Sequence, residues 1–324
     1  MSRLHRVLLY EEMHREGTRL LQEKCRVTYA KSYDEDILIK QLKDINAIII
    51  RANGSITKRI IESAPELKVI GRHGVGLDNI DLKAARENGI KVTYTPYANT
   101  ESVAEHFVAL ALMLAKKMRL ADIALRRGDW NARYELIGTE LYSKTLGVVG
   151  FGRIGQQTAH ICHHGFGMKV LYYDVKRYPD KEGPLKATFV DLQRLFTESD
   201  FISINLSLSS QTQHLIDANL LRYMKPTAFL INMARGPVWK EADIIKALKE
   251  KLITGVGSDV YEIEPASLDN PLFAMDNFIG TPHMSAHTED SMVRMSMVAS
   301  DVIAVLEGQD PKFPVPEELY DLEN

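Results

Sequence analysis

The stretch TLGVVGFGRIGQQTA, residues 145–159, decides the fold. Its apolar run ends at Gly150, and the pattern Gly150-x-Gly152-x-x-Gly155 opens a helical segment. In this spacing the first glycine permits a tight turn, the second lets the backbone approach a pyrophosphate, and the third allows close packing of helix on strand. The flanking strand and helix patterns give the motif its weight, so the stretch predicts a dinucleotide-binding βαβ unit rather than a turn without a ligand.

The residues that follow indicate which dinucleotide is bound. The amides of Arg153 and Ile154 would face the phosphates at the positive end of the helix. The next apolar run, MKVLYYD, ends at Asp174. A carboxylate at this distance from the glycines binds the ribose hydroxyls and repels a 2′-phosphate, which favours NAD over NADP. Lys176 and Arg177 follow closely and weaken that exclusion.

Working outward, apolar runs alternate with helical patterns along most of the chain. Five such runs precede residue 97, and further runs follow residue 145; they lie at 6–10, 26–30, 47–51, 67–72, 90–96, 168–174, 201–206, 228–233, 254–260 and 277–282. This alternation predicts an α/β protein with parallel sheets covered by helices on both faces. Residues 100–128 and 289–308 each read as one long helix, and we expect these to be the crossings between two domains.

Composition excludes several classes of protein. Hydrophobic residues make up 45% and charged residues 26% of the 324 residues, as in ordinary globular proteins. The net charge of −3 does not suggest a nucleic-acid binder, and no apolar run approaches the length of a membrane span. The start of the chain lacks a signal-peptide pattern, and the two cysteines, Cys25 and Cys162, form no ligand pattern. We therefore expect a cytoplasmic protein.

Charged side chains follow three of the later strands. Arg235 comes after a buried strand, Asp259 and Glu264 come after the next, and His283 follows the last. A guanidinium grips a carboxylate through two hydrogen bonds, a histidine moves a proton, and a carboxylate orients that histidine and favours its charged form. Next to a nicotinamide, this set suits hydride transfer at a 2-hydroxy or 2-oxo acid.

The histidines of TPHMSAH, residues 281–287, raise a second interpretation. Two histidines four apart can bind zinc when both lie on one helical face with a further ligand. Here Thr281-Pro282 places His283 before a helix begins, and no cysteine or HExxH pattern accompanies it. We expect no metal, and we interpret His283 as the acid/base. The role of His287, at substrate or at a partner subunit, stays open.

These motifs together resemble the D-2-hydroxyacid dehydrogenase family. The similar segments are GRHGVGLDNIDLKAA, TPYANTESVAEH, GTEL, TLGVVGFGRIG, INMARGPV, SDVYEIEP and TPHMSAHT, in this order. The resemblance implies a flavodoxin-like substrate domain built from residues 1–98 and 288–324, and a Rossmann NAD domain at 99–287. It also implies a cleft between them, and a homodimer or dimer of dimers joined through the NAD domains.

The resemblance also assigns residues. It places Arg235, Glu264 and His283 at the catalytic positions, and Asp259 at the nicotinamide carboxamide. It implies further cofactor contacts from Thr212, Met233, Ala234, Ser285 and Ala286. Substrate contacts implied by the second glycine cluster are those of Gly74, Val75 and Gly76, whose amides would hold a carboxylate.

The substrate stays open between two alternatives. Arg51 and Arg72 follow strands of the first domain, and two arginines suit a phosphate dianion, as in D-3-phosphoglycerate dehydrogenases. Many relatives keep an arginine at position 51 with other substrates, so glyoxylate, hydroxypyruvate or another 2-oxo acid is the alternative. A different class, an NAD-sensing corepressor that binds partner proteins, also fits the fold.

Overall fold

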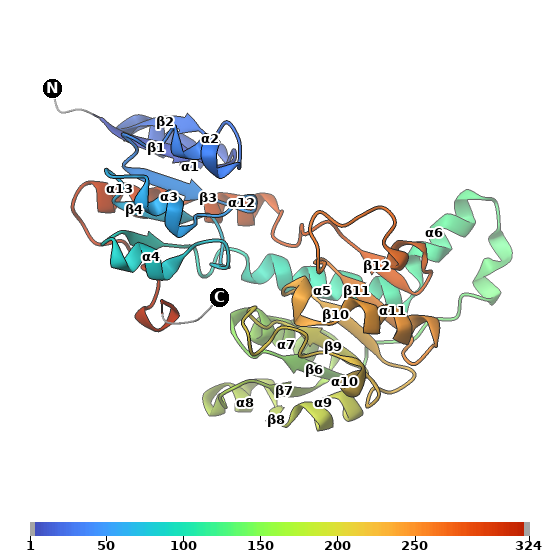
Figure 1. The fold of residues 1–324 in the computed structure, drawn as a ribbon. Coiled ribbons are helices and arrows are strands. Elements are labelled where there is room, and N and C mark those ends of the chain that lie inside the picture. Colours follow the sequence, from blue (N-terminus) through green and yellow to red (C-terminus); the bar gives the residue numbers. More distant parts are fainter. Residues whose placement is uncertain (1–3, 321–324) are drawn as a thin grey trace. The chain divides into compact units, whose positions relative to one another are not determined.

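The computed structural model describes residues 4–320, which fold into two compact units (Figure 1). The first unit contains the residues up to Asn99 together with those from His287 onward, and the second contains Thr100–Ala286. These boundaries fall one residue from those expected from the sequence. The assignment of substrate binding to the first unit stays a prediction.

The first unit is a parallel sheet with helices on both faces. Its strand order, β2-β1-β3-β4-β5, is the flavodoxin-like order. In chain order its elements are β1 (His5–Leu9), α1 (Arg15–Lys24), β2 (Cys25–Tyr29), α2 (Glu35–Ile39), β3 (Ala47–Ile50), α3 (Lys58–Glu62), β4 (Val69–Arg72), α4 (Leu82–Glu87), β5 (Lys91–Thr93), α12 (Glu289–Ser296), α13 (Val298–Leu306) and the 3₁₀ turn η4 (Glu317–Leu319).

Alternate residues of these strands supply two separate cores. Val7, Ile49 and Val69 pack with α1 and α13 on one face, while Leu8 and Ile48 pack with α2, α3 and α4 on the other. Each fully buried aliphatic side chain of this kind contributes about 1.5–3 kcal/mol. A strand buried on both faces reads as a continuous apolar run, as β3 does, since all four of its residues are buried.

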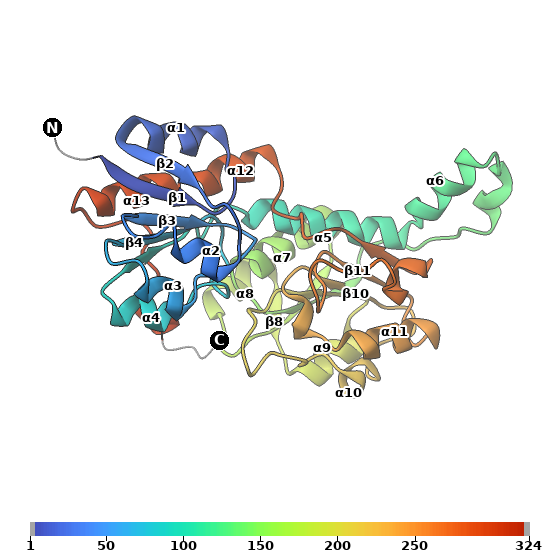
Figure 2. The ribbon, with the colours of Figure 1, turned by 45° about the horizontal axis from the view of Figure 1, so that its top comes forward.

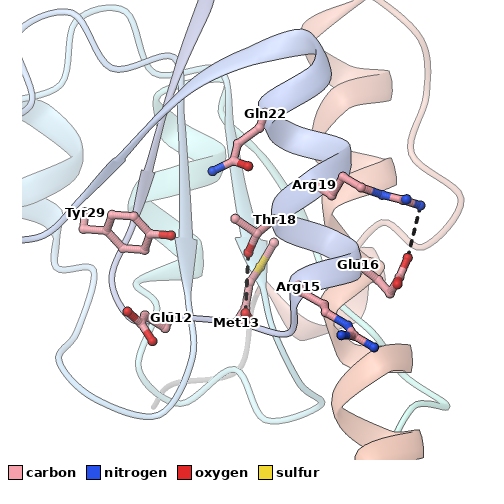
Figure 3. Close-up of a pocket in the computed structure, with 8 residues that line it drawn as sticks. All are labelled: Glu12, Met13, Arg15, Glu16, Thr18, Arg19, Gln22 and Tyr29. Carbon is pink, nitrogen blue, oxygen red and sulfur yellow. Dashed lines mark hydrogen bonds and ion pairs between the residues drawn. The ribbon is translucent and has the colours of Figure 1, made fainter.

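The helices of the first unit sit close to its sheet. A Cβ placed on Gly71 of β4 would lie 2.7 Å from Cγ2 of Val302, so this glycine lets α13 pack directly on the strand. On α1, Thr18 donates to the carbonyl of Met13 and Arg19 pairs with Glu16, beside a hollow of about 570 Å³ (Figure 3).

The second unit is the Rossmann arrangement. Seven parallel strands lie in the order β12-β11-β10-β9-β6-β7-β8, so the direction of winding switches between β6 and β9. Its elements are α5 (Thr100–Ala115), α6 (Met118–Arg126), η1 (Trp130–Tyr134), β6 (Thr145–Val149), α7 (Arg153–Phe166), β7 (Lys169–Tyr173), α8 (Pro179–Leu185), β8 (Ala187–Phe189), α9 (Leu192–Glu198), β9 (Phe201–Ile204), α10 (Ala218–Leu221), β10 (Phe229–Asn232), η2 (Gly236–Val238), α11 (Glu241–Lys249), β11 (Gly255–Ser258), η3 (Pro271–Ala274) and β12 (Phe278–Gly280).

The sheet of the second unit is also buried on both faces. One core joins its strands to α9, α10 and α11, and the other joins them to α5 and α7. Within this unit, α6 and η1 stand away from the sheet in both views (Figures 1 and 2). No residue of α6 or η1 is buried, which separates this segment from the rest of the unit.

Two expectations about helices were wrong. Residues 100–128 form α5 and α6 rather than one helix, because Lys117 between them takes a left-handed backbone with φ of 52°. Residues 289–308 likewise form two helices, α12 and α13, with Met297 between them. Within residues 4–320, no helix combines the length and the apolar character needed to cross a membrane.

Candidate active site

The glycine loop after β6 has the shape that a dinucleotide requires. Gly150 has φ of 89°, and a Cβ on it would lie 2.8 Å from the carbonyl of Asn205, which follows β9. A Cβ on Gly155 would lie 2.2 Å from the carbonyl oxygen of Gly150, so any side chain there would push α7 off the loop. A Cβ on Gly152 would meet nothing within 4 Å, which leaves room for a pyrophosphate at the start of α7. Arg153 and Ile154 form the first turn of that helix.

Asp174 lies against this loop. The amide of Phe151 donates to its Oδ2 at 2.7 Å, and the amide of Gly150 donates to the carbonyl of Tyr173 at 2.8 Å. The carboxylate thus sits at the end of β7, beside the glycines, and its ribose role stays a prediction. The residues present fit a bound NAD.

The turn after β10 sets the backbone of Arg235. Buried Asn232 accepts from the amide of Ala234 at 2.9 Å and donates to the carbonyl of Arg235 at 3.0 Å. A Cβ on Gly236 would lie 1.8 Å from the carbonyl oxygen of Tyr261. This close approach presses the arginine turn onto the loop that carries Glu264.

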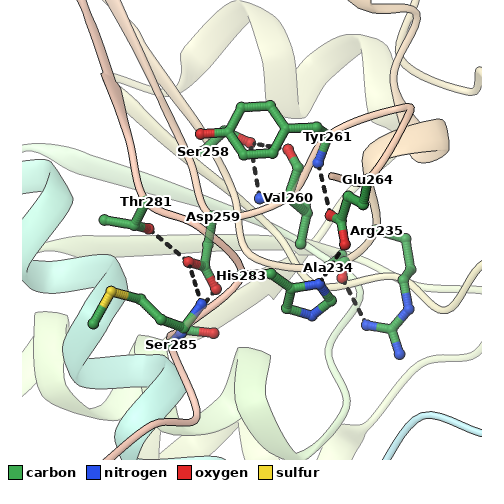
Figure 4. A network of polar contacts seen from close by, with 11 residues as sticks. Ala234, Arg235, Ser258, Asp259, Val260, Tyr261, Glu264, Thr281, His283 and Ser285 are labelled. Atoms are coloured by element: carbon green, nitrogen blue, oxygen red, sulfur yellow. Dashed lines mark hydrogen bonds and ion pairs between the residues drawn. The ribbon is translucent and has the colours of Figure 1, made fainter. Parts of the chain in front are cut away.

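Glu264 and His283 form a direct pair. The Nδ1 atom of His283 lies 2.7 Å from Oε2 of Glu264, and the amide of Tyr261 donates to Oε1 at 2.9 Å (Figure 4). Burial alone would raise the pKa of Glu264. The hydrogen bond and charge of His283, the Tyr261 amide and the charge of Arg235 outweigh burial and hold that pKa below its usual range. The carboxylate is therefore kept ionised beside the imidazole.

His283 has an unusual backbone, and Asp259 stabilises it. The histidine has φ of 49°, and its amide donates to the carbonyl of Asp259 at 2.8 Å. The Asp259 carboxylate is fully buried and accepts from the hydroxyl of Thr281 at 2.6 Å and from the amides of Met284 and Ser285 at 2.8 Å each. Both of its oxygens are thus engaged in fixing the loop, a structural task that the sequence did not suggest.

Helix α5 supports the same loop. Nε2 of His106 lies 2.9 Å from the hydroxyl of Thr281, and Ser102 donates to the carbonyl of Ser285. Burial lowers the pKa of His106, with Asp259 opposing it, so the neutral imidazole is favoured. No pattern in the sequence indicates this contact, because His106 and Thr281 are 175 residues apart in the chain.

The remaining residues expected near the nicotinamide follow the strands β9, β10 and β12 of the second unit. Met233 and Ala234 are buried directly after β10, and Ala286 ends the second unit. Thr212 lies in the loop after β9, where its hydroxyl donates to the carbonyl of Ser207 at 2.6 Å and accepts from the amide of Ser209 at 2.8 Å. It therefore orders that loop internally.

In the first unit, the residues expected to bind substrate fall into two groups. Arg51 follows β3, and its Nη2 lies 2.8 Å from Nε2 of His287 and 3.3 Å from the sulfur of Met292. A guanidinium only donates, so His287 must accept through Nε2. Glu11 accepts from the amides of Ala52 and Asn53, which fixes the loop after Arg51.

The Arg72 side chain donates hydrogen bonds to the loop that follows it in the chain. It donates from Nη1 to the carbonyl of His73 at 2.9 Å and from Nε to the carbonyl of Gly76. Gly74 has φ of 139° and its amide bonds to the hydroxyl of Thr95 at 3.0 Å, while Val75 and Gly76 are half-buried. His73 is buried, and burial, reinforced by the charge of Arg51, lowers its pKa to about 3.

The second unit is thus a dinucleotide-binding domain that carries an arginine, a glutamate and a histidine beyond its strand ends. Residues 108–285 match the sequence model of the D-isomer specific 2-hydroxyacid dehydrogenase NAD binding domain. A glyoxylate reductase of Thermofilum pendens is 39% identical over 312 residues, which cover 94% of this chain and 92% of the relative. A D-3-phosphoglycerate dehydrogenase of Methanocaldococcus jannaschii is 38% identical over 306 residues, covering 94% of this chain and 58% of that protein.

A solved structure agrees with these relatives. The D-lactate dehydrogenase of Aquifex aeolicus, complexed with NAD and lactic acid, superposes with a TM-score of 0.84 at 29% identity, over 94% of this chain and 96% of that one. The chain belongs to the D-2-hydroxyacid dehydrogenase family. It is an oxidoreductase that acts on 2-hydroxy acids and uses NAD.

Proposed function

We propose that the chain reduces a small, unphosphorylated 2-oxo acid, with glyoxylate as the first candidate, and that Arg235, Glu264 and His283 are its catalytic residues. The observation that carries the catalytic assignment is the 2.7 Å pair of His283 with Glu264, on a loop that contacts the Arg235 turn. Its geometry matches the acid/base-plus-orienter arrangement that proton transfer requires.

Each of these side chains has a distinct task in the proposed mechanism. NAD, when bound, supplies or accepts the hydride. Arg235 binds the substrate carboxylate through its guanidinium and polarises the neighbouring carbonyl. Because Glu264 engages Nδ1 of His283, Nε2 is the atom that donates a proton to the carbonyl oxygen during reduction and takes it back during oxidation.

The position of Arg72 supports an unphosphorylated substrate. Two of its three guanidinium nitrogens donate to carbonyls of its own loop, at His73 and Gly76. The Arg51 guanidinium contacts His287 and Met292 through one nitrogen, Nη2, so we assign a distal substrate group to Arg51 rather than to an arginine pair. The Thermofilum pendens relative named glyoxylate reductase agrees with this choice, whereas the Methanocaldococcus jannaschii relative represents the phosphorylated alternative.

We also assign substrate binding to the first unit. The amides of Val75 and Gly76 suit a carboxylate, as successive backbone N–H groups in a glycine-rich turn commonly do. Arg51 follows β3 next to β1, where the winding of this sheet switches direction. Ligands of open α/β sheets bind outside the carboxyl ends of strands at such points.

A substrate panel tests the proposal. Purified protein with NADH is assayed by absorbance against glyoxylate, hydroxypyruvate, pyruvate and 3-phosphohydroxypyruvate. We expect the highest kcat/KM with glyoxylate or hydroxypyruvate. A higher value with 3-phosphohydroxypyruvate would overturn the substrate choice but keep the reaction. No turnover with any 2-oxo acid, together with NAD-dependent binding of partner proteins, would favour the corepressor alternative.

A homodimer formed through α6 and η1 is part of the proposal. Side chains exposed along this segment and the loop after it include Leu125, Trp130, Tyr134, Ile137 and Tyr142, each more than half accessible. Monomers rarely expose so many large apolar groups together, and interfaces favour aromatic residues. At the root of α6 lies an apolar pocket of about 590 Å³, lined in part by Met113, Leu120 and Met275. A second copy of this chain is the proposed occupant of this surface.

A reducing, cytoplasmic location completes the proposal. It is supported by Cys25 and Cys162, which are free thiols and buried. Burial raises the pKa of the Cys162 thiol to about 12, so this side chain stays protonated and inert.

A further inference from the structure

The segment after β7 carries two cations close to the proposed ribose acid. Asp174 is followed by Lys176 and Arg177, and its carboxylate accepts from the Phe151 amide of the glycine loop. A cation at this place would normally attract the 2′-phosphate of NADP and oppose the selection that Asp174 imposes. In the structure, both cationic side chains contact other groups of this segment.

Arg177 is held by Glu182 of α8. Its Nε and Nη2 each donate to a different oxygen of the Glu182 carboxylate, both at 2.7 Å. The hydroxyl of Tyr172 donates to the same carboxylate at 2.8 Å and accepts from the Tyr178 amide at 2.9 Å. The Glu182 side chain is only 16% exposed. Arg177 is 60% exposed, so what distinguishes this pair from an ordinary surface ion pair is its two-point geometry and the third donor, Tyr172.

Lys176 contacts the aromatic ring of Tyr178. Its Nζ lies 5.1 Å from the centre of the Tyr178 ring, a cation–π distance. Tyr178 itself packs on Phe151 and Tyr172, so Lys176 lies against an aromatic cluster next to α8, while Arg177 pairs with Glu182.

We propose that Glu182 is a specificity-determining residue for the cofactor. By holding Arg177 against α8, it withholds the counter-charge that a 2′-phosphate would need. Two carboxylates then select NAD: Asp174 repels the phosphate, and Glu182 holds the Arg177 guanidinium away from it. The inference rests on the ribose role proposed for Asp174, but it does not depend on the identity of the 2-oxo acid.

Dissociation constants for NADH and NADPH, measured by fluorescence titration, test the proposal without any substrate. The background is Asp174→Asn, which removes the repelling charge but keeps an acceptor for the Phe151 amide. In this background, Glu182→Gln is expected to tighten NADPH binding about fivefold, the effect of releasing one well-formed ion pair. NADH binding is expected to stay within about twofold, which also shows that the variant is folded.

Two further variants make the test specific. Adding Arg177→Gln to the double variant is expected to erase the gain in NADPH affinity. Glu198→Gln, which breaks the 2.7 Å pair with Arg194 on α9, is the matched control and is expected to leave both constants unchanged. Glu182→Ala repeats the main test with the whole carboxylate removed.

Three outcomes would overturn the inference. They are unchanged NADPH affinity in both Glu182 variants, a gain that survives Arg177→Gln, or a loss of NADPH affinity on Arg177→Gln while Glu182 is intact. A failure of the Asp174 assignment is distinguishable, because Asp174→Asn alone would then leave the ratio of the two constants at its wild-type value. A wrong substrate class affects none of these measurements.

Discussion

At the scale of single residues, His283 pairs with Glu264 and has a left-handed backbone conformation, which is rare for a residue other than glycine. A left-handed conformation costs a non-glycine residue roughly 1–2 kcal/mol. Here it is held by hydrogen bonds from its amide to the carbonyls of Asp259, at 2.8 Å, and Thr281, at 3.1 Å. The conformation turns the imidazole toward Glu264, so the strain is associated with the proposed proton transfer.

His283→Ala tests that association. Loss of the acid/base is expected to lower kcat by about 10²–10⁴-fold, because general acid–base help is of that size. The dissociation constant for NADH should change little, since the glycine loop is untouched. His164→Ala, an exposed histidine of α7, is the matched control and should keep wild-type turnover. Near-normal turnover of the His283 variant would refute the assignment.

Gly236 gives a second test at this scale. A methyl group there would lie 1.8 Å from the Tyr261 carbonyl oxygen, which belongs to backbone and cannot move away easily. Gly236→Ala should therefore lower the free energy of unfolding by about 1–3 kcal/mol or more. Gly165→Ala, in α7 with nothing within 4 Å, should raise it by up to about 1 kcal/mol. Urea denaturation measures the free energy of unfolding of both variants. Equal changes would contradict the close approach of Gly236 to the Tyr261 carbonyl.

The charged residues near the strand ends could be predicted from the sequence, but the residues that hold their loops in place could not. Arg235, Glu264 and His283 were visible because charges after buried strands are conspicuous in a sequence. The supporting contacts of Asn232, His106 and Glu11 were not predicted, because a polar side chain that holds a loop has no signature in the sequence. The full burial of Asp259, and its bonds to three groups of the loop, likewise appear only in three dimensions.

At the scale of elements, the ionised Glu182 of α8 makes the stability of the β7–α8 segment depend on pH. Hydrogen bonds from Arg177 and Tyr172 lower the pKa of Glu182 to about 2. An unfolded glutamate titrates near 4.3. A carboxyl group with a depressed folded-state pKa stabilises the protein above its unfolded pKa, and that stabilisation is lost as pH falls through the folded-state pKa.

Glu182→Gln should therefore have a pH-dependent effect on stability. The difference in free energy of unfolding between wild type and the variant should be constant from about pH 7 to 5 and shrink below about 4.3. Urea unfolding at a series of pH values measures it. Arg177→Gln should weaken the same dependence, because it removes the principal donor. A difference that grows toward low pH would contradict the assigned sign.

The strands were predictable where the sequence holds an apolar run. All eleven other strands coincide with such runs, whereas β8 was missed because its three residues, Ala187, Thr188 and Phe189, form none. The break between α5 and α6 was missed for a different reason. It falls at Lys117, where no glycine, proline or asparagine announces a left-handed residue.

At the scale of the whole molecule, two sheets of different winding follow each other along one chain. The prediction of an α/β protein with a flavodoxin-like and a Rossmann sheet is confirmed by the strand orders. The strand order could not be predicted from the apolar runs alone, because these do not show which strands lie next to each other. The resemblance to the family supplied that prediction. The proposed dimer lies at this scale too.

Leu125→Asp combined with Ile137→Asp tests the dimer. A charge at each of these exposed apolar positions should turn a dimer into a monomer in light scattering coupled to size-exclusion chromatography. Lys181→Asp, at an exposed position of α8, is the control for added negative charge. A wild-type protein that is already monomeric at micromolar concentration, or a variant that stays dimeric, would refute the proposed surface.

The buried Asp259 carboxylate bears on protein design. Copying Glu264 and His283 onto another parallel sheet would transfer two side chains but not the turn that aims them. The recipient scaffold would also need an internal acid able to gather one hydroxyl and two amides, as Asp259 does with Thr281, Met284 and Ser285. The smallest transplantable unit is therefore the loop with its acid, and a designer who moves only the dyad should expect an imidazole pointing elsewhere.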